Sequence, residues 1–68
     1  MKYSIGIKGI PEYGLSNGVI LHDPQERDWF NSLSEVLLYI DENLNLLNAD
    51  LKDLGFEDKE LSILKKEN

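Results

Sequence analysis

The sequence LSEVLLYIDENLNLLNADLKDL, residues 33–54, contains the most regular pattern in the chain. Its apolar residues recur at alternating intervals of four and three positions, which places them on one face of an α-helix. Ser32 and Glu35 form a capping box that begins a helix, and Gly55 stands where that helix should end. The recurring residues, which we call the leucine ladder, are Leu33, Leu37, Ile40, Leu44, Leu47, Leu51 and Leu54.

The leucine ladder is long for so small a chain. An unbroken helix over residues 33–54 would extend about 33 Å, whereas a globule of this size has a diameter of about 28 Å. In one alternative the helix breaks near residues 48–50, where Asn and Asp are good caps, and folds back as a hairpin. In the other it stays whole, and a second chain covers the surplus apolar face. The ladder residues are therefore expected either to lie in the core or to form a homo-oligomer contact through the helix of residues 33–54.

The N-terminal part has the alternation of β-strands. In residues 2–8 every second residue is apolar, which predicts a half-buried strand. Gly9 and Pro11 end this pattern, so we expect residues 9–18 to be a connection. Asn17 and Gly18 are a strong turn signal, because both tolerate positive φ. A second strand is predicted at residues 19–22.

Residues 24–31 allow two interpretations. Asp23, Pro24 and Glu26 could begin a helix, or Pro24 could occupy a type I turn that leads into a third strand at residues 27–30. We favour the turn and strand, because the start signal at Ser32 follows immediately.

The last part of the chain is expected to be helical. Residues 58–66 contain three apolar residues and end in Lys65 and Lys66, which favour a helix C-terminus. The segment of residues 51–56, with Gly55 and Phe56 after a helix, resembles the first turn of ubiquitin-associated domains, and that resemblance implies a following helix. The expected core is Tyr3, Ile5, Ile7, Val19, Leu21, Phe30, Leu33, Leu37, Ile40, Leu44, Leu47, Leu54, Phe56, Leu61 and Leu64.

These elements together predict one α+β domain over residues 1–68. The predicted fold is a small antiparallel sheet of two or three strands in the order β-β-β-α-α, packed by one long or broken helix and a short C-terminal helix. The chain has 68 residues and no cysteine, so no disulfide or thiolate zinc site can support a small core. The N-terminus resembles an unprocessed cytoplasmic start, and no apolar run reaches the roughly 18 residues that cross a bilayer. We expect a soluble, cytoplasmic protein that does not bind membranes.

The chain carries a formal charge of −6, from thirteen acidic and seven basic residues. Direct binding of nucleic acid is not expected, because phosphate contacts depend on Lys and Arg. The negative charge lies mainly between residues 41 and 60, and we predict that these acids form a protein interface. They are Asp41, Glu42, Asp50, Asp53, Glu57, Asp58 and Glu60.

No arrangement typical of catalysis is recognisable. His22 is the only histidine, so a Ser-His-Asp relay would have to pass through it. Residues 41–45 begin like a calcium loop, but Leu46 occupies the glycine position and Lys52 the position of the bidentate carboxylate. We predict no enzyme activity, no catalytic residue, no cofactor and no metal.

The function expected from these properties is binding of another protein, as a small acidic inhibitor or regulatory adaptor. Small inhibitors of this kind occur in phages and mobile elements. In one version residues 41–60 act as a decoy that occupies the nucleic-acid groove of a basic enzyme. The alternative is a self-associating structural or assembly protein that acts through its leucine-rich helix.

Overall fold

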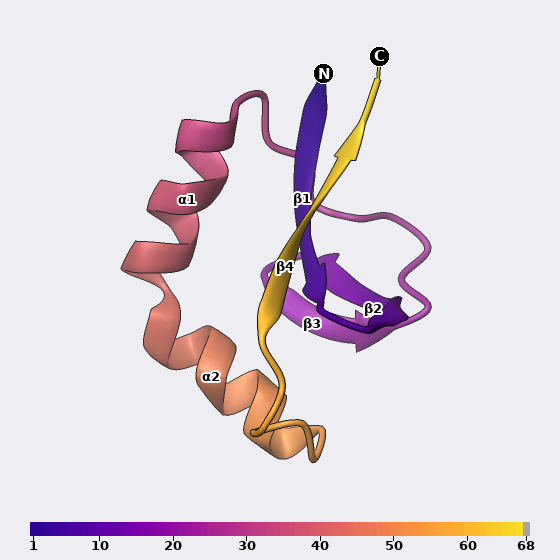
Figure 1. The fold of residues 1–68 in the computed structure, drawn as a ribbon, viewed down its shortest axis with the longest axis vertical. Coiled ribbons are helices and arrows are strands. Elements are labelled where there is room, and N and C mark those ends of the chain that lie inside the picture. Colours follow the sequence, from indigo (N-terminus) through magenta and orange to yellow (C-terminus); the bar gives the residue numbers. More distant parts are fainter. Residues whose placement is uncertain (68) are drawn as a thin grey trace.

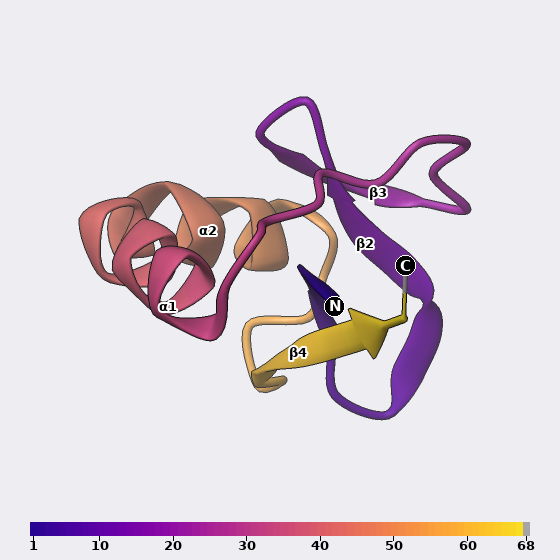
Figure 2. The ribbon, with the colours of Figure 1, turned by 90° about the horizontal axis from the view of Figure 1, so that it is seen from above.

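Four strands and two helices make up the fold in the computed structural model, which describes residues 1–67. The strands form one antiparallel sheet in the order β3-β2-β1-β4, and both helices lie on one face of it (Figures 1 and 2). The α+β class is thereby confirmed. The expected two or three strands and the order β-β-β-α-α are wrong in part, because the sheet has four strands and one of them follows the helices. The elements are β1 (Lys2–Ile7), β2 (Ile10–Ser16), β3 (Val19–His22), α1 (Leu33–Glu42), α2 (Leu44–Asp53) and β4 (Leu61–Lys66).

The first three strands form a meander. The predicted strand at residues 2–8 is confirmed as β1, and the turn at Asn17 and Gly18 is confirmed by φ angles of 51° and 79°. The predicted connection at residues 9–18 is wrong, because residues 10–16 form β2. Pro11 is exposed there, and the β1–β2 register shifts at a bulge after Gly6, so the strand accommodates residues that usually break strands.

The core lies between the sheet and the helices. Its fully buried apolar residues are Ile5, Ile7, Leu15, Ile20, Val36, Leu47 and Leu51. Half-buried residues packed against it include the expected Tyr3, Phe30, Ile40, Leu54, Phe56 and Leu61. Leu64 is half-buried as well.

Five residues of the expected core are exposed. In β3 the expected inward residues, Val19 and Leu21, face solvent, because the strand has the opposite parity and presents Ile20 to the core. The prediction of which side of the helices is buried is also wrong. Leu33, Leu37 and Leu44 are exposed, and Val36 is the residue that α1 buries.

The long helix is broken, but not where expected. Ser32 caps α1 by accepting a hydrogen bond from the Glu35 amide at 3.2 Å, which confirms the predicted start. The chain leaves helical geometry at Asn43 and not at residues 48–50. The Asn43 side-chain amide donates to the Tyr39 carbonyl at 3.0 Å, so this asparagine satisfies the end of α1 and lets α2 start in a new direction.

Gly55 ends α2 as predicted. Its φ of 82° allows the Gly55 amide to donate to the Lys52 carbonyl at 3.0 Å, and the Phe56 amide to donate to the Leu51 carbonyl at 2.8 Å. This pair of bonds is a Schellman motif.

Residues 24–31 form neither the favoured third strand nor a helix. The segment makes one isolated bridge, between Phe30 and Tyr3 of β1. Asp28 holds it in place: the Asp28 amide donates to the Leu15 carbonyl at 2.9 Å, and its carboxylate accepts from the amides of Asn17 and Gly18, each at 2.8 Å. The segment is thus anchored to the sheet at Asp28 and Phe30 without forming a regular element.

The predicted C-terminal helix is wrong, since its residues form β4. The strand pairs antiparallel with β1 along its whole length, from Lys2 opposite Lys66 to Ile7 opposite Leu61. The spacing of Leu61, Ile63 and Leu64 suits a helix or a strand equally well. Pairing with the unoccupied edge of β1, a contact distant in sequence, selects the strand.

Candidate protein-interaction surface

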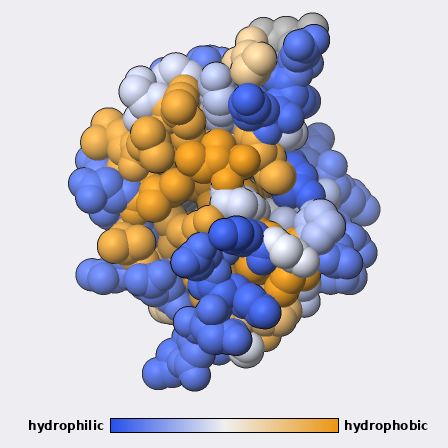
Figure 3. Space-filling view, in the orientation of Figure 1, coloured by the Kyte–Doolittle hydropathy of each residue, from blue (hydrophilic) through white to orange (hydrophobic). Residues whose placement is uncertain are grey.

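An apolar surface lies in the corner between α1 and β4. Three residues of the leucine ladder contribute to it from the helices: Leu33, Leu37 and Leu44 are 46%, 50% and 46% exposed. Figure 3 shows hydrophobic residues gathered on the side of the molecule where α1 and β4 face the viewer. Isolated exposed leucines are common, whereas a contiguous apolar patch is typical of a binding surface.

The geometry of α1 explains why these leucines point towards β4. Successive residues of a helix are rotated by about 100°. Val36 points into the core, and Tyr39 lies on one flank, where its ring is 5.2 Å from that of Phe30. Leu33 and Leu37 occupy the opposite flank and therefore face the β4 side of the sheet. Leu38 points away from the sheet altogether.

β4 supplies the floor of the corner. Leu61 and Ile63 stand opposite Ile7 and Ile5 of β1, so their side chains share the helix-facing side of the sheet. Both remain half-buried while Ile5 and Ile7 are fully buried. The difference arises because α1 packs mainly on β1 and α2 mainly on β3, so the helices cover the outermost strand less.

The outer edge of β4 presents backbone groups that pair with no other strand of residues 1–67. The Lys8 amide donates to the Glu60 carbonyl at 2.8 Å, so Glu60 and every second residue after it direct their backbone groups to β1. The residues between them, Leu61, Ile63 and Lys65, direct their N–H and C=O groups outwards. We call this edge, together with Leu33, Leu37, Ile40, Leu44 and the side chains of Leu61 and Ile63, the α1–β4 surface.

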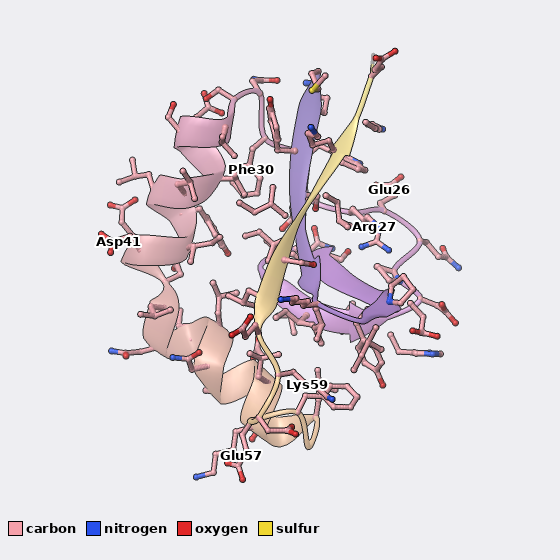
Figure 4. All side chains as sticks on the ribbon, in the orientation of Figure 1. Glu26, Arg27, Phe30, Asp41, Glu57 and Lys59 are labelled. Carbon is pink, nitrogen blue, oxygen red and sulfur yellow. The ribbon has the colours of Figure 1, made fainter. Side chains whose placement is uncertain are left out.

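The seven predicted interface acids are spread over a wide region. Asp41 projects from the outer side of α1, whereas Glu57 lies beyond the far end of α2 (Figure 4). Asp50 is engaged within the fold, where its carboxylate accepts from the Ile20 amide at 3.3 Å. Glu60 lies 3.7 Å from the Lys8 ammonium. Asp41, Glu42, Asp53, Glu57 and Asp58 are exposed, and their role as an interface stays a prediction, as does the nucleic-acid decoy.

The opposite face of the sheet carries a different feature. The Arg27 side chain lies against Gly14 of β2 and donates to the carbonyls of Pro11 and Tyr13 at 3.2 and 3.3 Å. Two hollows open beside residues 24–26, which line both of them. Arg27, Trp29 and Lys66 complete the lining of one, and residues 16, 17 and 21–23 complete that of the other. Their lining mixes polar and apolar groups. Within residues 1–67 no three His, Asp or Glu side chains are arranged to hold a metal ion.

The environment of Tyr39 clearly shifts the pKa of its side chain. Burial raises the pKa of the Tyr39 hydroxyl, and the negative charges of Asp28 and Asp50 raise it further. Above about pH 10 the unfolded chain ionises this tyrosine while the folded protein keeps it neutral. The unfolded state then binds fewer protons, so the free energy of unfolding falls as the pH rises.

We therefore expect Tyr39→Phe to reduce the alkaline loss of stability. Urea unfolding followed by circular dichroism, at neutral pH and at about pH 10.5, measures it. The free energy of unfolding should fall less with pH in the variant than in the parent protein. An equal fall in both proteins would contradict the assignment to Tyr39.

No family model, curated protein or solved structure matches this chain significantly. No helix formed by residues 1–67 has the length and apolar character needed to span a membrane. Sequence reasoning found the ladder but not the α1–β4 surface. The missing information was the strand β4 and the rotation of α1 that buries Val36.

Proposed function

We propose that this protein is a non-enzymatic protein-binding module that binds another protein through the α1–β4 surface. The observation that supports the proposal is that exposed apolar side chains and an unpaired strand edge lie next to each other. Half-exposed leucines of α1 stand beside a strand whose outer backbone groups have no partner within residues 1–67.

Both features favour a protein ligand over a small molecule. An added strand can pair with a free sheet edge through its backbone, while its side chains enter an adjacent apolar groove. The α1–β4 surface offers both kinds of contact side by side. The hollows of the opposite face have a mixed polar and apolar lining, to which the irregular segment contributes residues 24–26 in both cases.

Two adjacent leucines provide a matched test of this surface. Leu37 and Leu38 are exposed to similar degrees, 50% and 57%, but only Leu37 faces the corner. A photo-crosslinking residue can be placed at either position and activated inside the cells that make the protein. At position 37 it should form crosslinks to another protein, and at position 38 it should form few. The position-37 crosslinks should disappear when Leu44→Lys is added, because the lysine places a charge in the same apolar row.

Crosslinking that is equal at both positions, or insensitive to Leu44→Lys, would contradict the proposal. Circular dichroism checks that each variant is folded. A crosslink to a second copy of the chain counts as protein binding here, and the identity of the partner is a separate question.

A further inference from the structure

The two edges of the sheet differ in how well they are protected. β3 is four residues long and ends at His22, and the φ of 47° at Asp23 turns the chain away before Pro24. Short strands, prolines and turns of this kind prevent unwanted strand pairing. β4 is six residues long and pairs with β1 without a bulge. Its centre, Leu61 to Leu64, contains no charge and no proline, so β4 is the edge that can accept another strand.

The charges along β4 favour one occupant of that edge. Glu60 lies just before the strand, and Lys65 and Lys66 lie at its end. An antiparallel copy of the same strand reverses this order, so that each acidic end meets a basic end. We propose that the α1–β4 surface binds a second copy of the chain, with the two β4 strands paired antiparallel about a two-fold axis at Ile63. This inference rests on the proposed function, whose binding surface it uses.

The register follows from the outward-facing residues. Leu61, Ile63 and Lys65 direct their backbone groups outwards, so each must pair with a residue of the second copy that also directs its backbone groups outwards. With the axis at Ile63, Glu60 stands opposite Lys66 of the second copy, and Lys59 opposite Glu67. Opposite charges at directly paired positions stabilise a sheet, and like charges destabilise it. Moving the axis to Ser62 would set Lys59 against Lys65 of the second copy.

The same two-fold axis also covers the leucines. Directly opposed residues of antiparallel strands point to the same side, so both helical layers lie on one face of a continuous sheet. The two α1 helices are then separated by three strand spacings, about 14 Å, and each has a diameter with side chains of about 10–12 Å. The two α1 helices then run antiparallel above the paired β4 strands, and the flanks that carry Leu33 and Leu37 lie on the facing sides of the two helices. One contact thus satisfies the free edge and shields the exposed ladder residues.

A substitution at Lys65 tests the pairing of the two β4 strands most directly. Its N–H points away from β1, so Lys65→Pro removes a donor from the dimer contact and leaves the β1–β4 ladder intact. Lys65→Ala is the matched control, since it removes the same side chain but keeps the N–H. Sedimentation equilibrium of the purified chain over a roughly hundredfold concentration range measures the dissociation constant. We expect a dimer, with a dissociation constant raised roughly tenfold to a hundredfold by Lys65→Pro and only a few fold by Lys65→Ala.

A charge exchange tests the register independently of the proline. Glu60→Lys and Lys66→Glu should each weaken the dimer roughly tenfold, because each puts like charges opposite each other in both symmetric pairs. The double variant should restore the original dissociation constant. Dimers that are unaffected by Lys65→Pro, or no recovery in the double variant, would show that another surface or register is used.

A chain that stays monomeric over the whole range overturns the inference. The proposed function would still stand if the chain with Leu44 forms position-37 crosslinks to a different protein and the Leu44→Lys variant does not. If those crosslinks are absent as well, both proposals fail.

Discussion

Leu47→Ala should lower the free energy of unfolding by about 2–5 kcal/mol, because it leaves a cavity at the centre of the core. Leu47 is 1% exposed and joins α2 to the other buried residues of the core. A domain of this size has a total stability of about 3–10 kcal/mol. The substitution therefore removes a large part of the stability, and urea unfolding followed by circular dichroism should show a much lower midpoint.

Leu46→Ala is the matched control for this experiment. Leu46 is the preceding residue of α2, and it is 66% exposed. Surface substitutions of this kind change stability by about 0.5 kcal/mol or less. Similar losses in both variants would mean that the burial of α2 differs from the arrangement described above.

Gly14→Ala should lower the free energy of unfolding by about 1–2 kcal/mol, through the loss of hydrogen bonds made by Arg27. A Cβ atom on Gly14 would collide with the guanidinium Nη1 of Arg27 and lie 2.8 Å from its Cζ. The Arg27 side chain must then leave the strand and give up its bonds to the carbonyls of Pro11 and Tyr13.

The same substitution should behave differently when Arg27 is absent. In an Arg27→Ala background the nearest of the remaining neighbours of the added methyl group is the Pro24 side chain, at 3.4 Å. Alanine also restricts the unfolded chain more than glycine does, so Gly14→Ala should then be neutral or slightly stabilising. A double-mutant cycle by urea unfolding measures this coupling. Equal losses in both backgrounds would show that Gly14 is needed for a reason other than the guanidinium.

Local signals in the sequence predicted the features that depend on neighbouring residues. The capping box at Ser32, the turn at Asn17 and Gly18 and the helix end at Gly55 are all present in the structure. Each depends on hydrogen bonds or φ angles within a few residues, so its outcome does not change with the rest of the fold.

The errors concern contacts between residues far apart in the chain. β4 became a strand because β1 had an open edge, and no residue near Ile63 signals that partner. The parity of β3 could not be read from Val19, Ile20 and Leu21, since all three are apolar. The same ambiguity affected α1, where Val36 and Leu37 are both suited to burial. In a helix with apolar residues around much of its circumference, packing on the sheet decides which face is buried.

The position of β1 determines the order in which the sheet can assemble. β1 is first in the chain but lies in the middle of the sheet, between β2 and β4. Only Lys8 and Gly9 separate it from β2, whereas both helices separate it from β4. Joining β1 to β4 therefore closes the largest loop in the molecule, which carries the highest entropic barrier. We infer that the meander and helices form first and that the strand with the free edge is added last.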